Sequence, residues 1–522
     1  MKHDFSWIEK RNAGIFAHIS SLPSLQGIGN IGYSAQNFLE YLKLAKVKYW
    51  QICPLSPTSY GDSPYQSFSA YAGNTYFIDF RQLAATGVLD YSDLREIESL
   101  PHDHCDYGAL YKFMPPLIAK AAHNFFSNKS AAKALSDCFG QTYEIFCKKN
   151  AFWLNDYALF DALKKEFSGA SWTQWPKEFK NYNLAKKQKL TKTIVDAENT
   201  AKFAQWVFFS QYAKTKKIAN GYGIEIIGDM PIFVAKDSAD LWANPEIFDT
   251  CKDGSLRVVA GVGPDYFSPE GQLWGNPLYD WKNSYDKCLE FWKKRISKAL
   301  EIYDVIRLDH FRAFADYWAV EATAKTALNG KWLKGPGVKF FDAIKKEFTN
   351  AKFIAEDLGL LSQAACDLRD ELNIPAMAVL QFAFDSDTNN AYLPFNQKQN
   401  LVCYVGTHDN DTATSWYETA SERAKDYFRR YFRTAAKDPN WDMIYGAMFS
   451  PAKIGIIMLQ DILGLGGFAR MNTPGKPFGN WQWRVSQQLL DNSKHTSLGY
   501  FRYLCEISGR AFVATNSPKK EL

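Results

Sequence analysis

The sequence predicts an α/β protein built on a (β/α)8 TIM barrel with large insertions. Three features of the 522-residue chain lead to this fold class. Eight short apolar runs each end in a polar or Gly/Pro-marked turn, helix-like segments separate most of them, and two of the intervals are very long. Alternating buried strands and helices imply a parallel sheet, and its closed form with eight strands is the barrel.

The predicted strands are short, apolar and rich in β-branched or aromatic residues, as fully buried strands are. Helix-like segments such as 34–46 and 338–348 lie between them and carry apolar residues at helical spacing. In chain order, the predicted strands are 14–20, 49–57, 223–231, 305–311, 352–359, 376–384, 401–411 and 454–464.

Two intervals are far longer than an ordinary connection between a strand and a helix. About 165 residues separate Pro57 from Gly223, and more than 70 separate Pro231 from Val305. The first interval is Lys-rich and amphipathic, so 81–222 is predicted to be a mainly helical insertion after strand 2. The second is rich in Gly, Pro and aromatic residues, so 232–304 is predicted to bear an irregular lid after strand 3. The whole chain, 1–522, is predicted to be a single elaborated domain.

The charge balance excludes one class of partner. The chain has 61 Lys and Arg against 56 Asp and Glu, a net charge of +5, without the clustered basic stripe of a nucleic-acid binder. Aromatic residues make up 16% of the sequence, more than a core alone requires. This surplus is compatible with surfaces that stack on sugar rings.

The cysteines and the N-terminus bear on location. Nine scattered cysteines form no Cys-x-x-Cys pair, which is typical of a reducing compartment. The first residues lack an apolar signal region, and no uncharged apolar run reaches the length of a membrane span. We therefore expect a soluble cytoplasmic protein without a membrane partner.

Four carboxylates stand where predicted strands end. Asp229, Asp309, Glu356 and Asp409 close the third, fourth, fifth and seventh runs. A lone Asp at such a position is usually a helix cap or a turn former. Barrel active sites, however, are built at the carboxyl ends of the strands, so four acids at one mouth favour a catalytic site.

The run "VIRLDHF" (305–311) predicts a nucleophile beside an acid. Arg307 and Asp309 point to the same side of a strand, so the guanidinium is expected to keep Asp309 ionised. Glu356 on the next strand would have a raised pKa and act as the acid. Such a pair suits glycosidic-bond cleavage, and retention requires carboxyl groups about 5–5.5 Å apart. The residues alone do not separate Glu356 from Asp357 as the acid.

Other polar residues are less specific. His310 and His408 are expected to be neutral donors to sugar hydroxyls or supporting groups. The "HDHCD" run (102–106) is too compact for a metal site and is predicted to be a surface loop. The "GLGG" run (464–467) lacks the rest of a phosphate loop and is predicted to be a turn. No metal or organic cofactor is expected.

Longer motifs identify a family. They occur in order from near residue 14 to about residue 510, and the chain resembles the amylomaltases: the 4-α-glucanotransferases, or disproportionating enzymes, of glycoside hydrolase family 77. The motifs are "SPYQSFSAYAGN" (63–74), "IGDMPIFVAKDSADLWANPEIF" (227–248), "QLWGNPLYDW" (272–281), "IRLDHFR" (306–312), "AEDLG" (355–359), "GTHDND" (406–411) and "RMNTPG" with "GNWQWR" (470–484).

The resemblance implies an activity and three catalytic roles. A segment of an α-1,4-glucan would move to the 4-hydroxyl of glucose or of another α-1,4-glucan, through a covalent glucosyl-enzyme and with retention. Asp309 matches the family's nucleophile. Glu356 matches the general acid/base, which decides between Glu356 and Asp357. Asp409 matches a third carboxylate that binds sugar hydroxyls.

The resemblance also implies a binding surface for α-1,4-glucans, maltooligosaccharides and glucose, and it implies no cofactor or metal. Its positions include residues around the reacting glucose, aromatic residues lining the subsites, and weaker candidates near both. These residues are Tyr65, Asp229, Trp274, Arg307, His310, His408, Ser63, Gln66, Asn472 and Pro474, with Asp265, Tyr266 and Phe267 in the lid.

One departure and three alternatives remain. The family's lid usually has a Pro where this chain has Gly263, which predicts a more mobile lid and less secure exclusion of water. An α-amylase-type hydrolase or a branching enzyme would use a similar set of carboxylates. An inert glucan-binding protein would not need them. The oligomeric state is not predicted.

Overall fold

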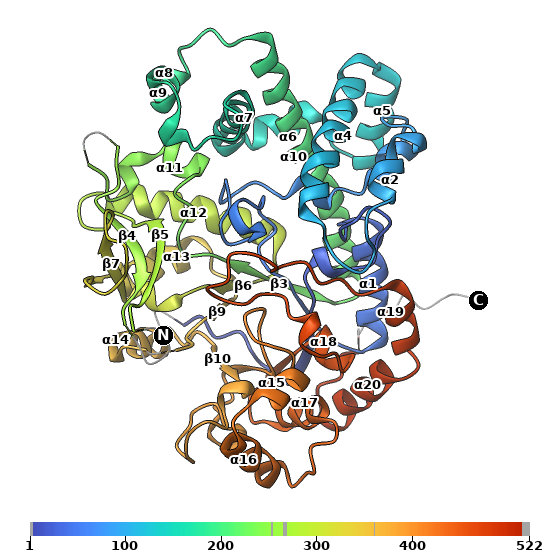
Figure 1. The fold of residues 1–522 in the computed structure, drawn as a ribbon, viewed down its shortest axis with the longest axis vertical. Helices are drawn as coiled ribbons and strands as arrows, with labels where there is room; N and C mark the ends of the chain where they lie inside the picture. The colour runs from blue at the N-terminus through green and yellow to red at the C-terminus, as the bar shows by residue number, and fades with distance from the viewer. Residues whose placement is uncertain (1–3, 252–253, 265–268, 360, 514–522) are drawn as a thin grey trace.

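The computed structural model describes residues 4–251, 254–264, 269–359 and 361–513. All eight predicted runs form strands of one parallel sheet, ordered β10-β11-β12-β1-β2-β3-β6-β9 (Figure 1). The strands are shorter than the apolar runs because each run continues into the turn that follows it. Their bounds are β1 Asn12–Phe16, β2 Tyr49–Gln51, β3 Glu225–Met230, β6 Val305–Leu308, β9 Phe353–Ala355, β10 Ala376–Val379, β11 Leu401–Tyr404 and β12 Ile454–Met458.

The sheet curls into a nearly closed barrel. Its two end strands, β9 and β10, approach each other where the N–H of Ala355 donates to the carbonyl of Pro375 at 2.9 Å. Nearly every strand residue is buried, which agrees with a sheet covered on both faces. The predicted fold class is therefore confirmed.

Amphipathic helices surround the barrel, with one exception. The connection from β10 to β11 has only 3-10 turns, at Leu380–Phe382 and Pro394–Asn396, so the strand–helix alternation fails there. The barrel and C-terminal helices are α1 Tyr33–Leu44, α12 Tyr285–Ile302, α13 Gly337–Glu347, α14 Gln363–Glu371, α15 Ala413–Thr419, α16 Glu422–Phe432, α17 Pro439–Phe449, α18 Leu459–Ile462, α19 Gln487–Ser493 and α20 Ser497–Ile507.

The long interval between β2 and β3 is helical, and Figure 1 shows it as the blue-to-green helices at the top of the view. Its last helix, α10, leads back into the barrel at β3. The boundaries 81–222 stay a prediction. The helices are α2 Phe80–Ala85, α3 Arg95–Glu98, α4 Tyr107–Ser127, α5 Lys129–Phe139, α6 Tyr143–Lys149, α7 Ala151–Glu166, α8 Lys177–Lys180, α9 Tyr182–Ala185 and α10 Lys192–Gly221.

The interval between β3 and β6 is more regular than the sequence suggested. After α11 (Ala239–Ala243), strands β4 (Val258–Val262) and β5 (Gln272–Pro277) join an antiparallel sheet of order β5-β4-β7-β8. Its other strands, β7 (Asp316–Glu321) and β8 (Lys331–Lys334), follow β6. This interval therefore contains paired strands beside its loops, and the lid-bearing insertion 232–304 stays a prediction. These strands escape detection because β8 is exposed throughout and β5 contains Gly and Pro.

A buried arginine closes the amino end of the barrel. The guanidinium of Arg510, behind α20, donates to the carbonyls of Met448 at 2.7 Å, Lys453 at 2.7 Å and Asn12 at 3.2 Å. Burial lowers its pKa to about 9. Arg510 therefore fastens α20 to the end of α17 and to the segments that enter β12 and β1.

Two chain-wide features complete the description. All nine cysteines are unpaired. In the part of the chain that the structure describes, no helix has the length and apolarity needed to cross a membrane.

Candidate active site

Two of the candidate carboxylates are neighbours because the barrel ladder continues past the strand ends. The N–H of Asp309 donates to the carbonyl of Met230, and that of Glu356 donates to the carbonyl of Leu308, each at 3.1 Å. Asp309 directly follows β6, and Glu356 directly follows its partner β9. Both side chains therefore start from the carboxyl end of the barrel on adjacent strands.

Arg307 connects two carboxylates below the mouth. Its Nη1 donates to both carboxylate oxygens of Asp229, at 2.7 and 2.6 Å, and to Oδ1 of Asp309 at 3.0 Å. Asp229 and Arg307 are directly paired on β3 and β6, and both are buried. Although burial opposes its charge, the surrounding carboxylates raise the pKa of Arg307 well above its ordinary value. Arg307 therefore stays charged.

Asp309 and Glu356 titrate as a pair. Burial, with the negative charges of Asp229 and Glu356, raises the pKa of Asp309 to about 8, while Arg307 opposes the rise. Burial also raises the pKa of Glu356. Arg307 lowers the pKa of Asp309 as expected, but burial outweighs it, and the guanidinium is also shared with Asp229. Near neutral pH the pair retains a proton, as an acid beside a nucleophile requires.

The geometry distinguishes Glu356 from Asp357. Glu356 accepts hydrogen bonds from the backbone N–H groups of His310 at 2.7 Å and Leu358 at 3.2 Å, which hold its carboxyl group beside the end of β6. Asp357 is buried and bonded to the guanidinium of Arg369 on α14. Asp357 is thus committed to an ion pair with α14, which leaves Glu356 as the candidate acid beside Asp309.

Asp409 is the most accessible of these acids. It follows β11 by five residues, and its side chain is 46% exposed, so a ligand can reach it. Its Oδ1 accepts a hydrogen bond from Nδ2 of Asn472 at 2.6 Å, and its Oδ2 lies 3.4 Å from Nε2 of His408. Arg470 donates to its backbone carbonyl at 2.6 Å. The segment after β12 therefore orients this carboxylate.

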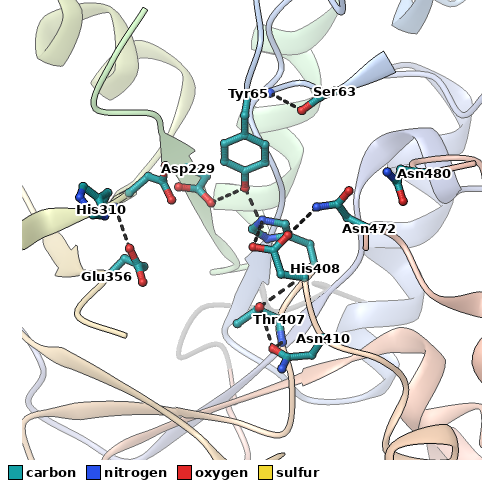
Figure 2. A network of polar contacts seen from close by, with 12 residues as sticks. Ser63, Tyr65, Asp229, His310, Glu356, Thr407, His408, Asn410, Asn472 and Asn480 are labelled. Carbon is teal, nitrogen blue, oxygen red and sulfur yellow. Dashed lines mark hydrogen bonds and ion pairs between the residues drawn. The ribbon is translucent and has the colours of Figure 1, made fainter. Parts of the chain in front are cut away.

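Stacked aromatic rings connect Asp229 with His408, the neighbour of Asp409. The hydroxyl of Tyr65 donates to Oδ2 of Asp229 at 2.7 Å and lies 3.4 Å from Nδ1 of His408 (Figure 2). The rings of Tyr65 and His408 stack with centroids 4.9 Å apart, and Trp481 lies 5.8 Å from Tyr65. Burial lowers the pKa of His408, so its imidazole is neutral near pH 7.

The second sheet supplies another aromatic residue to the mouth. Trp274, on β5, packs edge-to-face against His310 with centroids 4.9 Å apart. His310 has a left-handed backbone, with φ of 49°, in the turn after β6. Burial lowers its pKa to about 4, so it too is neutral near pH 7.

The weaker candidates lie in two loops. The Ser63 hydroxyl accepts a hydrogen bond from the N–H of Tyr65 at 3.2 Å, and Gln66 lies in the same loop. Pro474 is exposed in the loop that follows Asn472. The lid residues 265–267 lie outside the described part of the chain. Gly263 is described, and a Cβ at this position would lie 3.3 Å from the ring of Trp318.

The sequence analysis did not identify some residues that contact the candidate active site. Trp481, with φ of 63°, and Arg470 act on Tyr65 and Asp409 from the segment after β12. Both lie in motifs that carried the family resemblance, but no local pattern reveals their contacts. His18, at the end of β1, is also buried near His408, and burial lowers its pKa to about 3.

Neither the HDHCD run (102–106) nor the GLGG run (464–467) forms a metal or phosphate site in the described part of the chain. His104 pairs with Asp103 at 2.8 Å on an exposed loop, and Gly464 lies in a turn after α18 with φ of 65°. Across the described ranges, no three His, Cys, Asp or Glu side chains are grouped to hold a metal ion.

Comparisons with known proteins identify a family for this chain. The 4-alpha-glucanotransferase family model matches residues 17–490. The chain is 43% identical to 4-alpha-glucanotransferase of Thermus thermophilus over 91% of this chain and 95% of that protein. It is 40% identical to the Synechocystis 4-alpha-glucanotransferase over 98% and 100%.

Solved structures are similar to this chain as well. Amylomaltase from Streptococcus agalactiae, in complex with acarbose, superposes with a TM-score of 0.88 at 34% identity, covering 96% of this chain and all of that one. The amylomaltase of Corynebacterium glutamicum, 16% identical with a TM-score of 0.71 over 96% and 75% of the chains, shares the fold. With a family model over most of its length and relatives above 40% identity, the chain belongs to the 4-alpha-glucanotransferase family.

Proposed function

We propose that this protein is a 4-α-glucanotransferase that moves a segment of an α-1,4-glucan to the 4-hydroxyl of glucose or of another α-1,4-glucan. The observation that carries the proposal is the placement of Asp309 and Glu356 on the carboxyl ends of adjacent strands of the barrel. Family membership gives the donor and acceptor class.

In the first half-reaction, a carboxylate oxygen of Asp309 attacks C1 of a glucose residue. The bond from C1 to the glycosidic oxygen breaks, and the proton of Glu356 passes to that oxygen as the shortened chain leaves. Arg307 holds Asp309 in place and remains charged throughout. The product is a covalent glucosyl-enzyme and a free chain end.

In the second half-reaction, Glu356 is ionised and removes the proton from the 4-hydroxyl of the acceptor sugar. The acceptor oxygen attacks C1, the bond to Asp309 breaks, and the α configuration is restored by the second inversion. Water gives hydrolysis if it takes the acceptor's place. Trp274 and Tyr65 supply aromatic surfaces on which sugar rings can displace water.

Neutral donors and an exposed acid fit the sugar hydroxyls. His310 and His408 are uncharged near pH 7, so each can donate one N–H without adding positive charge near the reacting carbon. Asp409 can accept hydrogen bonds from hydroxyl groups as charge develops on the ring. These roles predict losses of activity rather than of folding on substitution.

Maltotriose without added metal or cofactor tests the proposal. We expect glucose and a ladder of longer oligomers while total reducing ends stay constant, and loss of both in Asp309→Asn. Reducing ends that rise with cleavage would indicate a hydrolase. New α-1,6 linkages would indicate a branching enzyme, and binding without turnover an inert glucan-binding protein.

We also propose a cytoplasmic location. The nine unpaired cysteines support it, since oxidising compartments favour disulfides. Fractionation of the native host, with a cytoplasmic marker enzyme followed in parallel, tests this location.

A further inference from the structure

A second aromatic surface lies on the outside of the barrel, along α17 and α20. Trp441, near the start of α17, packs edge-to-face against Tyr500, near the start of α20, with centroids 4.7 Å apart. Tyr445 and Phe449 follow Trp441 at intervals of four residues and are 49% and 39% exposed. Tyr500 is 47% exposed and Tyr503 53%. Contiguous exposed rings of this kind mark binding surfaces.

A hollow of about 350 Å³ adjoins the Trp441–Tyr500 pair. Among the described residues that line it, none is charged. The side chains of Asn492 and Ser497 take part in no hydrogen bond with other described residues, so their polar groups are free for a ligand. The other lining residues are Leu463, Leu489, Ser493 and Thr496.

The hollow lies toward the catalytic end of the barrel. Arg510 ties the far end of α20 to Met448, at the far end of α17, and to Lys453, which precedes β12. The starts of both helices, where Trp441 and Tyr500 meet, therefore lie toward the carboxyl ends of the strands. Figure 1 shows α17, α18 and α20 grouped on one side of the barrel.

We propose that this groove binds a segment of an α-1,4-glucan outside the active site. The C–H faces of glucose pack against aromatic rings, whose faces carry partial negative charge, and its hydroxyl groups can meet Asn492 and Ser497. The uncharged lining disfavours phosphates, nucleotides and carboxylates as ligands. The identity of the glucan rests on the proposed function. The hollow is at the small end of ligand sites, so it holds a short segment of the chain.

The neighbouring rings extend the surface beyond the hollow. Trp441, Tyr445 and Phe449 rise by about 6 Å from one to the next along α17, which gives a row about 12 Å long.

A second copy of the chain is the other candidate occupant. A hollow with unpaired amide and hydroxyl groups suits a sugar better than a flat apolar contact, because a contact would leave those groups buried without partners.

Native gel electrophoresis with soluble amylopectin, together with kinetics, tests the groove. Tyr500→Ala and Asn492→Ala remove a stacking ring and a polar group, and Tyr91→Ala, at a 58% exposed tyrosine in the helical region, is the matched control. We expect amylopectin to bind about fivefold more weakly to Tyr500→Ala, with a similar rise in KM for amylopectin. Maltotriose kinetics should change by less than about twofold, and Tyr91→Ala should match the wild type.

Unchanged retardation of Tyr500→Ala by amylopectin overturns the proposal. A wild-type dimer that Tyr500→Ala converts to a monomer, with amylopectin binding retained, also overturns it and assigns the surface to a second copy. The gel detects binding without turnover, so the two proposals can fail separately. A wild-type protein that binds amylopectin through Tyr500 but leaves maltotriose intact contradicts only the proposed activity.

Discussion

Tyr65→Phe removes one hydrogen bond from the buried charge cluster and leaves the aromatic stack in place. The hydroxyl donates to Asp229 at 2.7 Å, while the ring packs on His408 at 4.9 Å. A hydrogen bond to a charged acceptor contributes about 1.5–3 kcal/mol. Because Asp229 keeps both contacts with Arg307, at 2.7 and 2.6 Å, we expect the lower end of this range.

The loss should appear as a change in pH dependence. Without the Tyr65 hydroxyl, Asp229 interacts more strongly with Arg307. The hydrogen bond from Arg307 to Asp309, at 3.0 Å, is longer than its two hydrogen bonds to Asp229 and is weakened in turn. The pKa of Asp309 then rises further above its ordinary value, and less of the nucleophile is ionised at acidic pH. A loss of about 1.5 kcal/mol corresponds to about tenfold, or about one pH unit on the acid limb.

The assay is the pH profile of kcat/KM for maltotriose disproportionation. Tyr404→Phe is the control, since it removes a buried hydroxyl of the same barrel whose partner, Gln51 at 2.8 Å, is neutral. We expect Tyr65→Phe to lose about tenfold below the acid limb and to recover at alkaline pH, and Tyr404→Phe to keep the wild-type limb. A loss of equal size at every pH would refute the reasoning and leave Tyr65 only a contact to the sugar.

Three further predictions concern stability and water. Burial raises the pKa of Asp461 to about 7, so the folded protein loses stability as pH rises from about 4 to about 7. Asp461→Asn should remove this loss, which amounts to about 4 kcal/mol at pH 8. Urea unfolding curves of the two proteins should therefore show a difference that grows with pH over this range. Asp309→Asn should raise the thermal midpoint near pH 8 while abolishing transfer, because the raised pKa of Asp309 means that its ionised form destabilises the folded protein. Gly263→Pro should lower the ratio of hydrolysis to transfer by restricting the lid backbone, measured as reducing ends released per glucose formed.

The barrel could be predicted because its strands are buried on both faces and therefore appear as continuous apolar runs. The second sheet could not, since its strands are exposed and its pairing joins segments on either side of β6. The sequence also gave no indication that the connection from β10 to β11 lacks an α-helix. Predictions from local pattern thus succeed where burial is uniform and fail where long-range pairing decides the structure.

The candidate site, too, could be predicted only in part. Asp309 and Glu356 could be placed because strand ends meet at one edge of a barrel. The residues alone could not distinguish Glu356 from Asp357, because the ion pair that occupies Asp357 comes from α14. Trp481 was missed for a similar reason, since its partners lie far away in the sequence.

The raised pKa values of Asp309 and Glu356 follow first from burial, and for Asp309 the neighbouring negative charges add to the rise. Asp229, Asp309 and Glu356 surround Arg307, and a single guanidinium cannot offset the charges of three carboxylates. In the empty protein this excess of negative charge is unfavourable, so a proton is retained. When the glycosidic bond breaks, positive charge develops on the sugar ring, and the same excess becomes complementary to it. The cluster therefore costs stability before substrate binds and stabilises the transition state afterwards, which is why stability and transfer should change in opposite directions when Asp309 loses its charge.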